Sequence, residues 1–146
     1  MNQAHLYLDT SAVAKLLIRE EPDADFAARL IARFDAIQTS LLTYPETMSA
    51  LTRARRDRRL SDQGLQDALD RFGTLWPRFE IVHFSERIAF DAAGFILDFP
   101  LSGADAVQIA SALSIPQEPT LTFASWDRRQ AEAARRLGLS IQPTVD

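Results

Sequence analysis

The sequence predicts an α/β fold in which a mostly parallel sheet of four to five strands is covered by helices on both faces. Short apolar segments of strand length alternate with segments whose apolar residues recur at helical spacing, and no repeat or long linker interrupts them. This alternation is typical of parallel sheets, because each crossover between parallel strands needs a helix-length connection. The 146 residues, 47% of them hydrophobic, suit one domain with one core, and we expect it to span residues 1–146.

Several segments have the composition of strands. The first, residues 5–8, is apolar after its histidine and ends directly before Asp9. Residues 79–84 alternate in the manner of a half-buried strand. The remaining strands are expected at residues 36–40, 120–123 and 139–142.

The segments between these strands have helical periodicity. In residues 12–18, for example, Val13, Leu16 and Leu17 share one face. Further helices are expected at residues 23–34, 43–59, 61–76, 85–97, 102–113 and 128–137. Five of these helices begin at side chains that can accept hydrogen bonds from the first turn, namely Asp23, Thr43, Ser61, Ser85 and Ser102. Gly138 is expected to close the last helix.

Four acidic residues stand where α/β sheets build their sites. Asp9 follows the first expected strand directly, and Asp127 follows the fourth after a short turn. Glu46 and Asp105 each lie in the first turn of an expected helix. Because the sites of parallel sheets form beyond the carboxyl ends of the strands, we expect the four side chains to converge there.

Converging carboxylates indicate a site for a hard divalent cation. Without a cation, such groups repel one another and raise each other's pKa. Oxygen ligands favour Mg²⁺ or Mn²⁺, and Mg²⁺ is held by a few carboxylates while it keeps several waters. A bound ion of this kind activates water and stabilises charge on a phosphate. The four acids therefore point to metal-dependent hydrolysis of phosphodiester bonds.

Each acid also has a structural interpretation. Glu46 and Asp105 both stand three residues after a capping hydroxyl, which is the pattern of a capping box. Asp127 is a candidate N-cap of the last helix. Asp9 is the hardest to explain in this way, because burying an acid at the end of an apolar strand is costly without a partner. The prediction of a site therefore rests on the set of four.

Composition excludes several rival chemistries. The chain has no cysteine, which excludes thiol nucleophiles and cysteine-based metal sites, and two histidines are too few for a histidine-rich site. A haloacid-dehalogenase-type phosphatase would use Asp9 as its nucleophile, but it needs a second aspartate two residues later and a lysine late in the chain. This chain has Ser11 in place of the second aspartate, and its single lysine, Lys15, lies early in the sequence. A receiver domain is excluded because it also needs a lysine late in the chain. Phosphate-binding glycine loops and a Gly-x-Ser-x-Gly elbow are absent from the sequence.

The net charge of −4 does not by itself suggest a nucleic-acid partner. If the four acids bind cations, however, the rest of the chain is neutral and that objection disappears. No apolar run approaches the ~20 residues of a membrane span, and the first residues lack the basic and apolar blocks of a secretory signal. We therefore expect a cytoplasmic protein without membrane association.

Four segments resemble the motifs of PIN-domain nucleases, in particular the toxins of the VapC type. In chain order they are LYLDTSA (6–12), YPETMSAL (44–51), LSGADAVQIA (101–110) and TFASWDRR (122–129), the last running into AEAARRLGL (131–139). The resemblance covers nearly the whole chain in the order of the family. It implies a PIN-like three-layer sandwich.

The resemblance also implies a metal-dependent endoribonuclease that is the toxin of a type II toxin–antitoxin pair. It implies that Asp9 and Asp105 bind Mg²⁺ or Mn²⁺, and that Glu46 and Asp127 complete the acidic site directly or through water. The implied partners are RNA and a cognate antitoxin. Two other functions stay open, a PIN nuclease of RNA processing that is not a toxin and a non-catalytic PIN-like binding module. The presence of all four acids argues against the binding module.

Two positions depart from the pattern of the family. Ser125 stands where threonine is common, which keeps a hydroxyl two residues before the last acid. Pro45 directly precedes Glu46, which can shift that side chain.

Hydroxyl and arginine side chains near the acids are candidates for substrate binding. Thr10, Ser11 and Ser125 can bond an acid, a water or a phosphate, although Ser11 is equally suited to cap the first helix. Arg53 lies two turns after the acid on its expected helix, and Arg128 directly follows the last acid. A solvated helix end is the alternative explanation for Arg53.

Apolar side chains outside the expected core leave two further questions open. Trp126 is more readily explained by packing than by stacking on a base. The apolar stripes of the helices at 43–59 and 61–76 suit a homodimer surface or an antitoxin groove, and packing of the two helices on each other explains them equally well.

Overall fold

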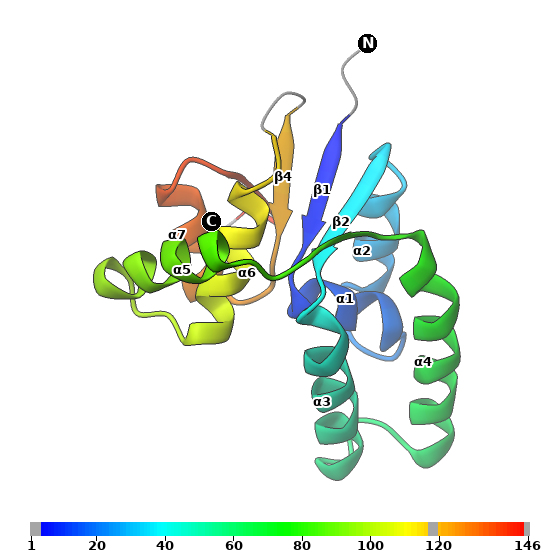
Figure 1. Cartoon of the computed structure of the whole chain (residues 1–146). Coiled ribbons are helices and arrows are strands. Elements are labelled where there is room, and N and C mark those ends of the chain that lie inside the picture. Colours follow the sequence, from blue (N-terminus) through cyan, green and yellow to red (C-terminus); the bar gives the residue numbers. More distant parts are fainter. Residues whose placement is uncertain (1–3, 117–119, 145–146) are drawn as a thin grey trace.

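The computed structural model describes residues 4–116 and 120–144 and contains a five-stranded sheet (Figure 1). The strand order is β3-β2-β1-β4-β5, and every neighbouring pair runs parallel. The strands are β1 (His5–Leu8), β2 (Ala36–Ser40), β3 (Glu80–Val82), β4 (Leu121–Ala124) and β5 (Ser140–Gln142). The predicted α/β fold with a mostly parallel sheet is confirmed.

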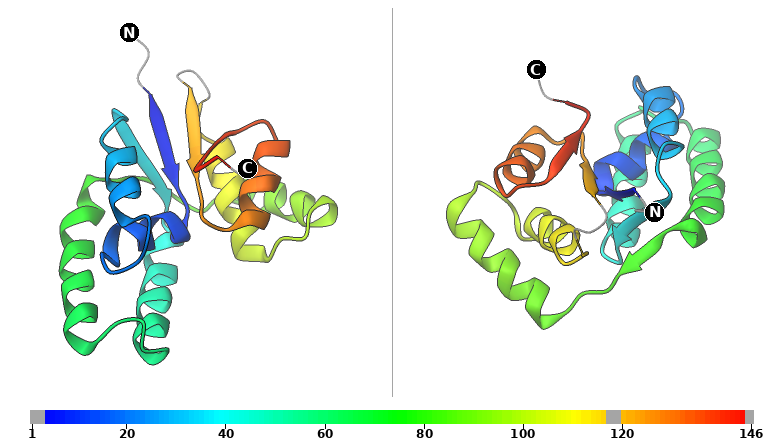
Figure 2. Two further views of the ribbon diagram at one scale, coloured as in Figure 1. Left: turned by 180° about the vertical axis from the view of Figure 1, so that it is seen from behind. Right: turned by 90° about the horizontal axis from the view of Figure 1, so that it is seen from above.

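Helices cover both faces of this sheet. They are α1 (Thr10–Leu17), α2 (Ala24–Ile31), α3 (Thr43–Arg56), α4 (Asp62–Leu75), α5 (Glu86–Asp98), α6 (Gly103–Leu113) and α7 (Arg128–Arg136), with a 3-10 turn η1 (Trp76–Arg78). Helices α1 to α4 gather on one side and α5 to α7 on the other (Figures 1 and 2). Helices α3 and α4 form a hairpin that extends past the carboxyl ends of the strands (Figure 1). None of the helices described here is long and apolar enough to cross a membrane.

The alternation of side chains along β1 supplies two separate cores. Leu6 and Leu8 pack against α1 to α4, whereas Tyr7 packs with Phe123 of β4 against α5 to α7. The rings of Tyr7 and Phe123 are stacked, with 5.4 Å between their centroids. Because both faces of β1 are covered, its sequence is a continuous apolar run rather than an alternating one.

The apolar stripes of α3 and α4 meet in the first of these cores. Leu51 of α3 and Phe72 of α4 are almost fully buried there. Tyr44 stacks on Phe72 with 4.9 Å between ring centroids, although 44% of its surface stays exposed. Packing of the two helices on each other, one of the two sequence interpretations, is therefore confirmed.

Thr43 does not cap α3, contrary to the prediction. The N-cap position is Leu42, whose backbone is already helical and whose side chain makes no cap. Thr43 is fully buried, and its hydroxyl oxygen lies 2.7 Å from that of Thr39 and accepts from Gln108 Nε2 at 3.0 Å. The predicted capping box with Glu46 is therefore wrong, because contacts with β2 and α6 take the threonine hydroxyl.

Two aspartates differ from their expected roles at helix starts. Asp9 itself caps α1 by accepting from the Ala12 amide, so this helix begins at Thr10 and Ser11 does not cap it. Asp23 precedes α2 with a positive φ of 73° and makes no side-chain cap. The predicted caps at the starts of α4, α5 and α6 are confirmed, namely Ser61, Ser85 and Ser102.

Three elements are shorter than predicted by three residues or more. Helix α3 ends at Arg56 instead of residue 59, because the Arg59 and Leu60 amides both donate back to the Ala54 carbonyl and Arg58 takes a φ of 62°. Helix α2 ends before residue 34, and β3 covers only residues 80–82 of the predicted 79–84. The predicted glycine at the end of α7 is confirmed, since Gly138 has a φ of 99°.

Candidate acidic site

The four acids follow from elements that meet at one edge of the sheet. Strands β1 and β4 pair in parallel with Leu8 beside Ala124, so Asp9 and Asp127 leave the same edge. Glu46 lies in the first turn of α3 and Asp105 in the first turn of α6. The topology thus gathers residues that are far apart in the sequence, as the strand-end rule predicts.

Asp9 is the most deeply buried of the acids, with 1% of its surface exposed. Its Oδ1 accepts hydrogen bonds from Ser11 Oγ at 2.7 Å and from the Ala12 amide at 2.9 Å. Its Oδ2 is buried and, among the described residues, has no hydrogen-bond partner. Burial raises the pKa of Asp9 to about 6, the nearby Ser125 and Ser11 hydroxyls and the Ala12 amide act to lower it, and the charge of Asp127 raises it further.

Asp105 and Asp127 are half-buried and influence each other. Burial raises the pKa of Asp105, hydrogen bonding to Ser102 lowers it, and the charges of Asp127 and Glu46 raise it again. A hydrogen bond of 3.2 Å from Gln130 Nε2 to the Asp105 carbonyl ties α7 to α6 at this point. The charges of Asp127 and Glu46 that act on Asp105 indicate that these carboxylates share one region.

Asp127 and Glu46 are each held by hydrogen-bond donors. Asp127 Oδ1 accepts from the Arg129 amide at 3.0 Å and the Gln130 amide at 3.3 Å, so its predicted role as N-cap of α7 is confirmed. Glu46 Oε1 accepts from Thr10 Oγ1 at 2.8 Å and from Gln108 Nε2 at 2.9 Å. These donors orient the carboxylates without neutralising them.

The three hydroxyl residues expected near the acids do lie there. Thr10 bonds Glu46, and Ser11 both donates to Asp9 and accepts from the Trp126 amide at 2.8 Å. Ser125 Oγ accepts from the Asp127 amide at 3.0 Å and is buried. These hydroxyls link the loops after β1 and β4.

The two arginines considered for substrate binding are both exposed. Arg128 starts α7 directly after Asp127, and Arg53 lies in the last turn of α3. Trp126, by contrast, contacts Phe26 edge-on at 6.1 Å, and its Nε1 donates to Asp23 at 3.2 Å. The packing interpretation of Trp126 is therefore confirmed.

Gln108 belongs to the site and was not expected there. It lies one turn after Asp105 on α6, is 2% exposed, and bonds Glu46, Thr43 and Tyr7. The available signal was a glutamine in residues 106–113, a run in which Ser111 is the one other polar residue. Its meaning depends on Glu46, a residue of another helix.

The donor set fits a hard divalent cation. Carboxylate oxygens are the ligands that Mg²⁺ and Mn²⁺ favour, and the unpartnered, buried Oδ2 of Asp9 is an oxygen that a cation would satisfy. Within residues 4–116 and 120–144, no three acidic or histidine side chains lie close enough to enclose an ion by themselves. A Mg²⁺ ion does not require three such side chains, because it is commonly held by one or two carboxylates while it keeps several waters.

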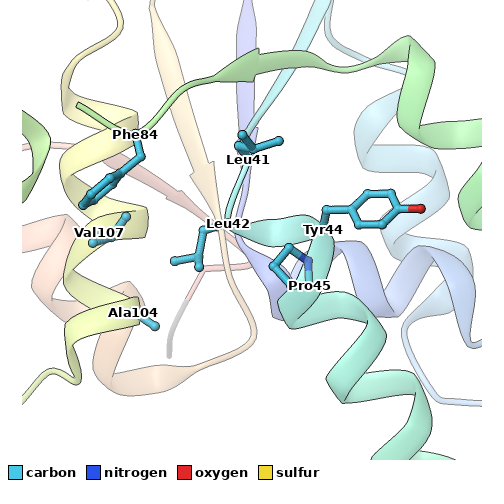
Figure 3. A pocket seen from close by; sticks show the side chains of 7 residues that line it. All are labelled: Leu41, Leu42, Tyr44, Pro45, Phe84, Ala104 and Val107. Atoms are coloured by element: carbon cyan, nitrogen blue, oxygen red, sulfur yellow. The ribbon is translucent and has the colours of Figure 1, made fainter.

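An apolar cleft of about 680 Å³ lies between the start of α3 and α6 (Figure 3). Its lining residues come from the end of β2, the start of α3, the segment after β3 and α6, and are Leu41, Leu42, Tyr44, Pro45, Phe84, Ala104 and Val107. Phe84 is 60% exposed and Leu41 45% exposed. Pro45 and Ala104 directly precede Glu46 and Asp105, so the cleft borders the acidic site and offers an apolar surface beside it.

Comparisons with known proteins identify the family. The model of the PIN domain matches residues 6–136. Ribonuclease VapC45 of Mycobacterium tuberculosis is 35% identical over 138 residues, which cover 94% of both chains. The crystal structure of VapC20 from the same species, a toxin that cleaves the sarcin–ricin loop, has a TM-score of 0.65 at 19% identity and covers 88% of this chain and 94% of that one. A toxin–antitoxin complex from Klebsiella pneumoniae has a TM-score of 0.55 at 19% identity, covering 86% and 88%. The chain therefore belongs to the PIN-domain family and, within it, to the VapC ribonucleases.

Proposed function

We propose that this chain is a metal-dependent endoribonuclease whose active site consists of Asp9, Glu46, Asp105 and Asp127. The observation that carries the proposal is the buried Asp9 carboxylate, whose Oδ2 has no partner in the described part of the chain. A buried charge without a partner is costly, and a divalent cation beside this oxygen would remove that cost. The neighbouring acids in the first turns of α3 and α6 and at the N-cap of α7 supply the remaining negative charge.

Asp9 and Asp105 hold Mg²⁺ or Mn²⁺ in this proposal, and Glu46 and Asp127 complete the site directly or through water. When bound, the cation stabilises charge on the phosphate and makes water a better nucleophile at neutral pH. The protein fixes the acids through Ser11 at Asp9 and through the first amides of α7 at Asp127. Such preorganisation favours the transition state because these dipoles need no rearrangement during the reaction.

Five residues are proposed to serve the substrate around this site. The hydroxyls of Thr10, Ser11 and Ser125 orient acids or their loops beside the proposed metal site. Arg128 and Arg53 are exposed cations on the two helices that also carry Asp127 and Glu46. Arginine at such positions contacts phosphate without reading the base.

The test is cleavage of RNA by purified full-length protein with Mg²⁺, with Mn²⁺ and with a chelator. Asp9→Asn should lower the rate more than about a hundredfold, since even the outer partners of metal ligands typically matter 10- to 100-fold. The matched control is Asp98→Asn, at the exposed end of α5, which should cleave RNA as the wild type does. Cleavage by Asp9→Asn at the wild-type rate, or full activity in the chelator, would contradict the proposal.

We propose that the chain acts as a single domain in the cytoplasm as the toxin of a toxin–antitoxin pair, with a small antitoxin as its partner. Its membership of the VapC ribonucleases supports this role, and one solved structure of the same fold is a toxin–antitoxin complex. Expression of the wild type should arrest growth, and co-expression of the neighbouring small gene should restore it. Asp9→Asn should be harmless. A harmless wild type with active nuclease would favour an RNA-processing enzyme, and growth arrest that persists with Asp9→Asn would show that the toxicity does not depend on the acidic site.

We also propose that the apolar cleft in Figure 3 receives a second copy of the chain. Its exposed side chains, Leu41 and Phe84, lie on either side of a surface that offers few polar groups to water. Exposed apolar patches of this kind are typical of protein–protein interfaces. A homodimer joined here would place its two acidic sites close to the interface.

A further inference from the structure

We infer that Gln108 is a positioning residue, which fixes the orientation of the Glu46 carboxylate through a buried network of neutral hydrogen bonds. The inference rests on the proposed function, because it assigns Gln108 a part in building that acidic site. Gln108 is on α6 and Glu46 is on α3, and the bond between them joins helices that lie on opposite sides of the sheet.

The contacts of Gln108 use both ends of its amide. Its Nε2 donates to Glu46 Oε1 at 2.9 Å and to Thr43 Oγ1 at 3.0 Å, with Thr10 Oγ1 at 3.4 Å. Its Oε1 accepts from the Tyr7 hydroxyl at 2.6 Å. With 2% of its surface exposed, Gln108 has little access to water as an alternative partner.

The Tyr7 hydroxyl determines which way the amide faces. The Tyr7 hydroxyl is a phenol, which carries its proton at neutral pH, and it donates that proton to Gln108 Oε1. Gln108 must therefore present its carbonyl oxygen to Tyr7 and its NH₂ group to Glu46. The reverse orientation would set an amide oxygen against a carboxylate and leave the Tyr7 proton facing another donor.

The network fixes one oxygen of Glu46 and leaves the other for the site. Gln108 and Thr10 both donate to Oε1, and neither bond uses Oε2. The donors are uncharged, so the carboxylate keeps its negative charge while its rotation is restricted. A carboxylate held in this way is preorganised toward a cation, as the outer partners of metal ligands generally are.

A role confined to the core would predict a different result from a positioning role. If Gln108 only satisfied buried polar groups, its replacement would lower stability and leave the remaining folded protein with a normal site. If it positions Glu46, the folded variant should bind a divalent cation less tightly and turn over more slowly. The two roles are therefore separated by cation affinity and by kcat, measured on folded protein.

The chain offers a closely matched control in Gln38 of β2. This glutamine is 6% exposed, and its Nε2 also donates to a glutamate carboxylate, that of Glu80, at 3.0 Å. Its Oε1 lies 3.0 Å from His5 Nδ1. Gln38→Met thus removes the same chemical group from a buried position without touching the acidic site.

The experiment measures Mn²⁺ affinity for wild type, Gln108→Met and Gln38→Met by electron paramagnetic resonance, with thermal unfolding as the check on folding. Gln108→Met should bind Mn²⁺ about tenfold more weakly, and Gln38→Met should bind within about twofold of the wild type. In RNA cleavage, Gln108→Met should lose about tenfold or more in kcat with little change in KM. Tyr7→Phe, which keeps the ring stack but not the hydroxyl, should shift both quantities in the same direction by less, and it tests the inference where Gln108→Met does not fold.

The outcomes separate this inference from the proposed function. Equal Mn²⁺ affinity in the wild type, Gln108→Met and Tyr7→Phe would overturn the positioning role, even with an inactive Asp9→Asn. A wild type that binds Mn²⁺ and cleaves no RNA would overturn the proposed activity, while the affinities would still decide the role of Gln108. A wild type without Mn²⁺ affinity would overturn both.

Discussion

At the scale of single residues, Asp9 has an unusual balance of contacts. One of its oxygens accepts two hydrogen bonds, while the other is buried without a partner in the described structure. The position at the end of β1 forces this burial, because both faces of the strand are covered. Burial makes the charged carboxylate less favourable relative to the protonated form, and it therefore raises the pKa of Asp9 to about 6.

This raised pKa makes stability depend on pH in a predictable direction. The folded protein binds the Asp9 proton more tightly than the unfolded chain, so the contribution is fully present below the ordinary pKa and is lost as pH rises through about 6. Without metal, wild type should lose about 2.5 kcal/mol of unfolding free energy relative to Asp9→Asn between about pH 4 and pH 7. Urea unfolding of both proteins in a chelator measures the difference. Parallel pH profiles would show that Asp9 is not the responsible group.

Arg128 offers a second residue-scale prediction. As an exposed cation beside Asp127, it should contact a phosphate of the RNA in the proposed complex. Arg128→Ala should weaken binding similarly for all RNA sequences and reduce the slope of log affinity against log salt by about one. The salt dependence of KM measures this slope.

The control for Arg128 is Arg135→Ala on the same helix. Arg135 forms two hydrogen bonds to Glu132, at 2.9 and 2.7 Å, and lies at the other end of α7. Arg135→Ala should leave the slope of log affinity against log salt unchanged. A loss of slope in both variants would indicate a general effect of charge and no contact at Arg128.

At the scale of elements, three serine caps set the starts of α4, α5 and α6. Ser85 Oγ accepts from the Ile88 amide at 3.2 Å, and Ser102 Oγ accepts from the Asp105 amide at 3.1 Å. The two caps are chemically alike, but only the second lies in the turn that carries an acid of the site. The first turn of α6 thus contains both the N-cap hydrogen bond and an acid of the proposed site.

This shared turn separates stability from activity in a pair of variants. Ser85→Ala and Ser102→Ala should each lose about 1 kcal/mol of unfolding free energy, the typical value of an N-cap. Only Ser102→Ala should also slow RNA cleavage, because it loosens the first turn around Asp105. Urea unfolding and cleavage rates of both variants test this. Equal cleavage rates in the two variants would rule out a role of this cap in the site.

Most helices and strands could be predicted from the periodicity of apolar residues, but the residues at which they begin and end were predicted less accurately. The residues of β1 and β2 were predicted correctly, and so was the start of α7, because caps and apolar runs there are local signals. The start of α3 was wrong, since Thr43 is satisfied by Thr39 and Gln108 and not by its own first turn. A local rule cannot anticipate a partner from another element.

At the scale of the whole molecule, an apolar cleft lies beside the acidic site at the edge of the sheet. Leu41→Glu or Phe84→Glu should lower the affinity of a homodimer formed at this cleft by at least about tenfold. Each substitution would bury a negative charge in the proposed interface. Sedimentation velocity over a range of concentrations measures the association. Each variant should remain folded, because both side chains are exposed in the single chain.

The control for the cleft is Thr74→Glu, which adds the same charge at an exposed position of α4. It should leave the association unchanged. A wild type that is monomeric at all concentrations, or equal loss in all three variants, would reject this interface.

The sequence by itself determined the α/β class, the order of strands and helices, and the placement of Asp9 and Asp127 at the ends of their strands. These follow from local periodicity and from the rule that parallel strands end at one edge. Only the tertiary structure decided which groups hold the acids. Gln108 meets Glu46 because α6 and α3 begin at the same edge of the sheet, and a hydrogen bond between residues so far apart in sequence has no local signature.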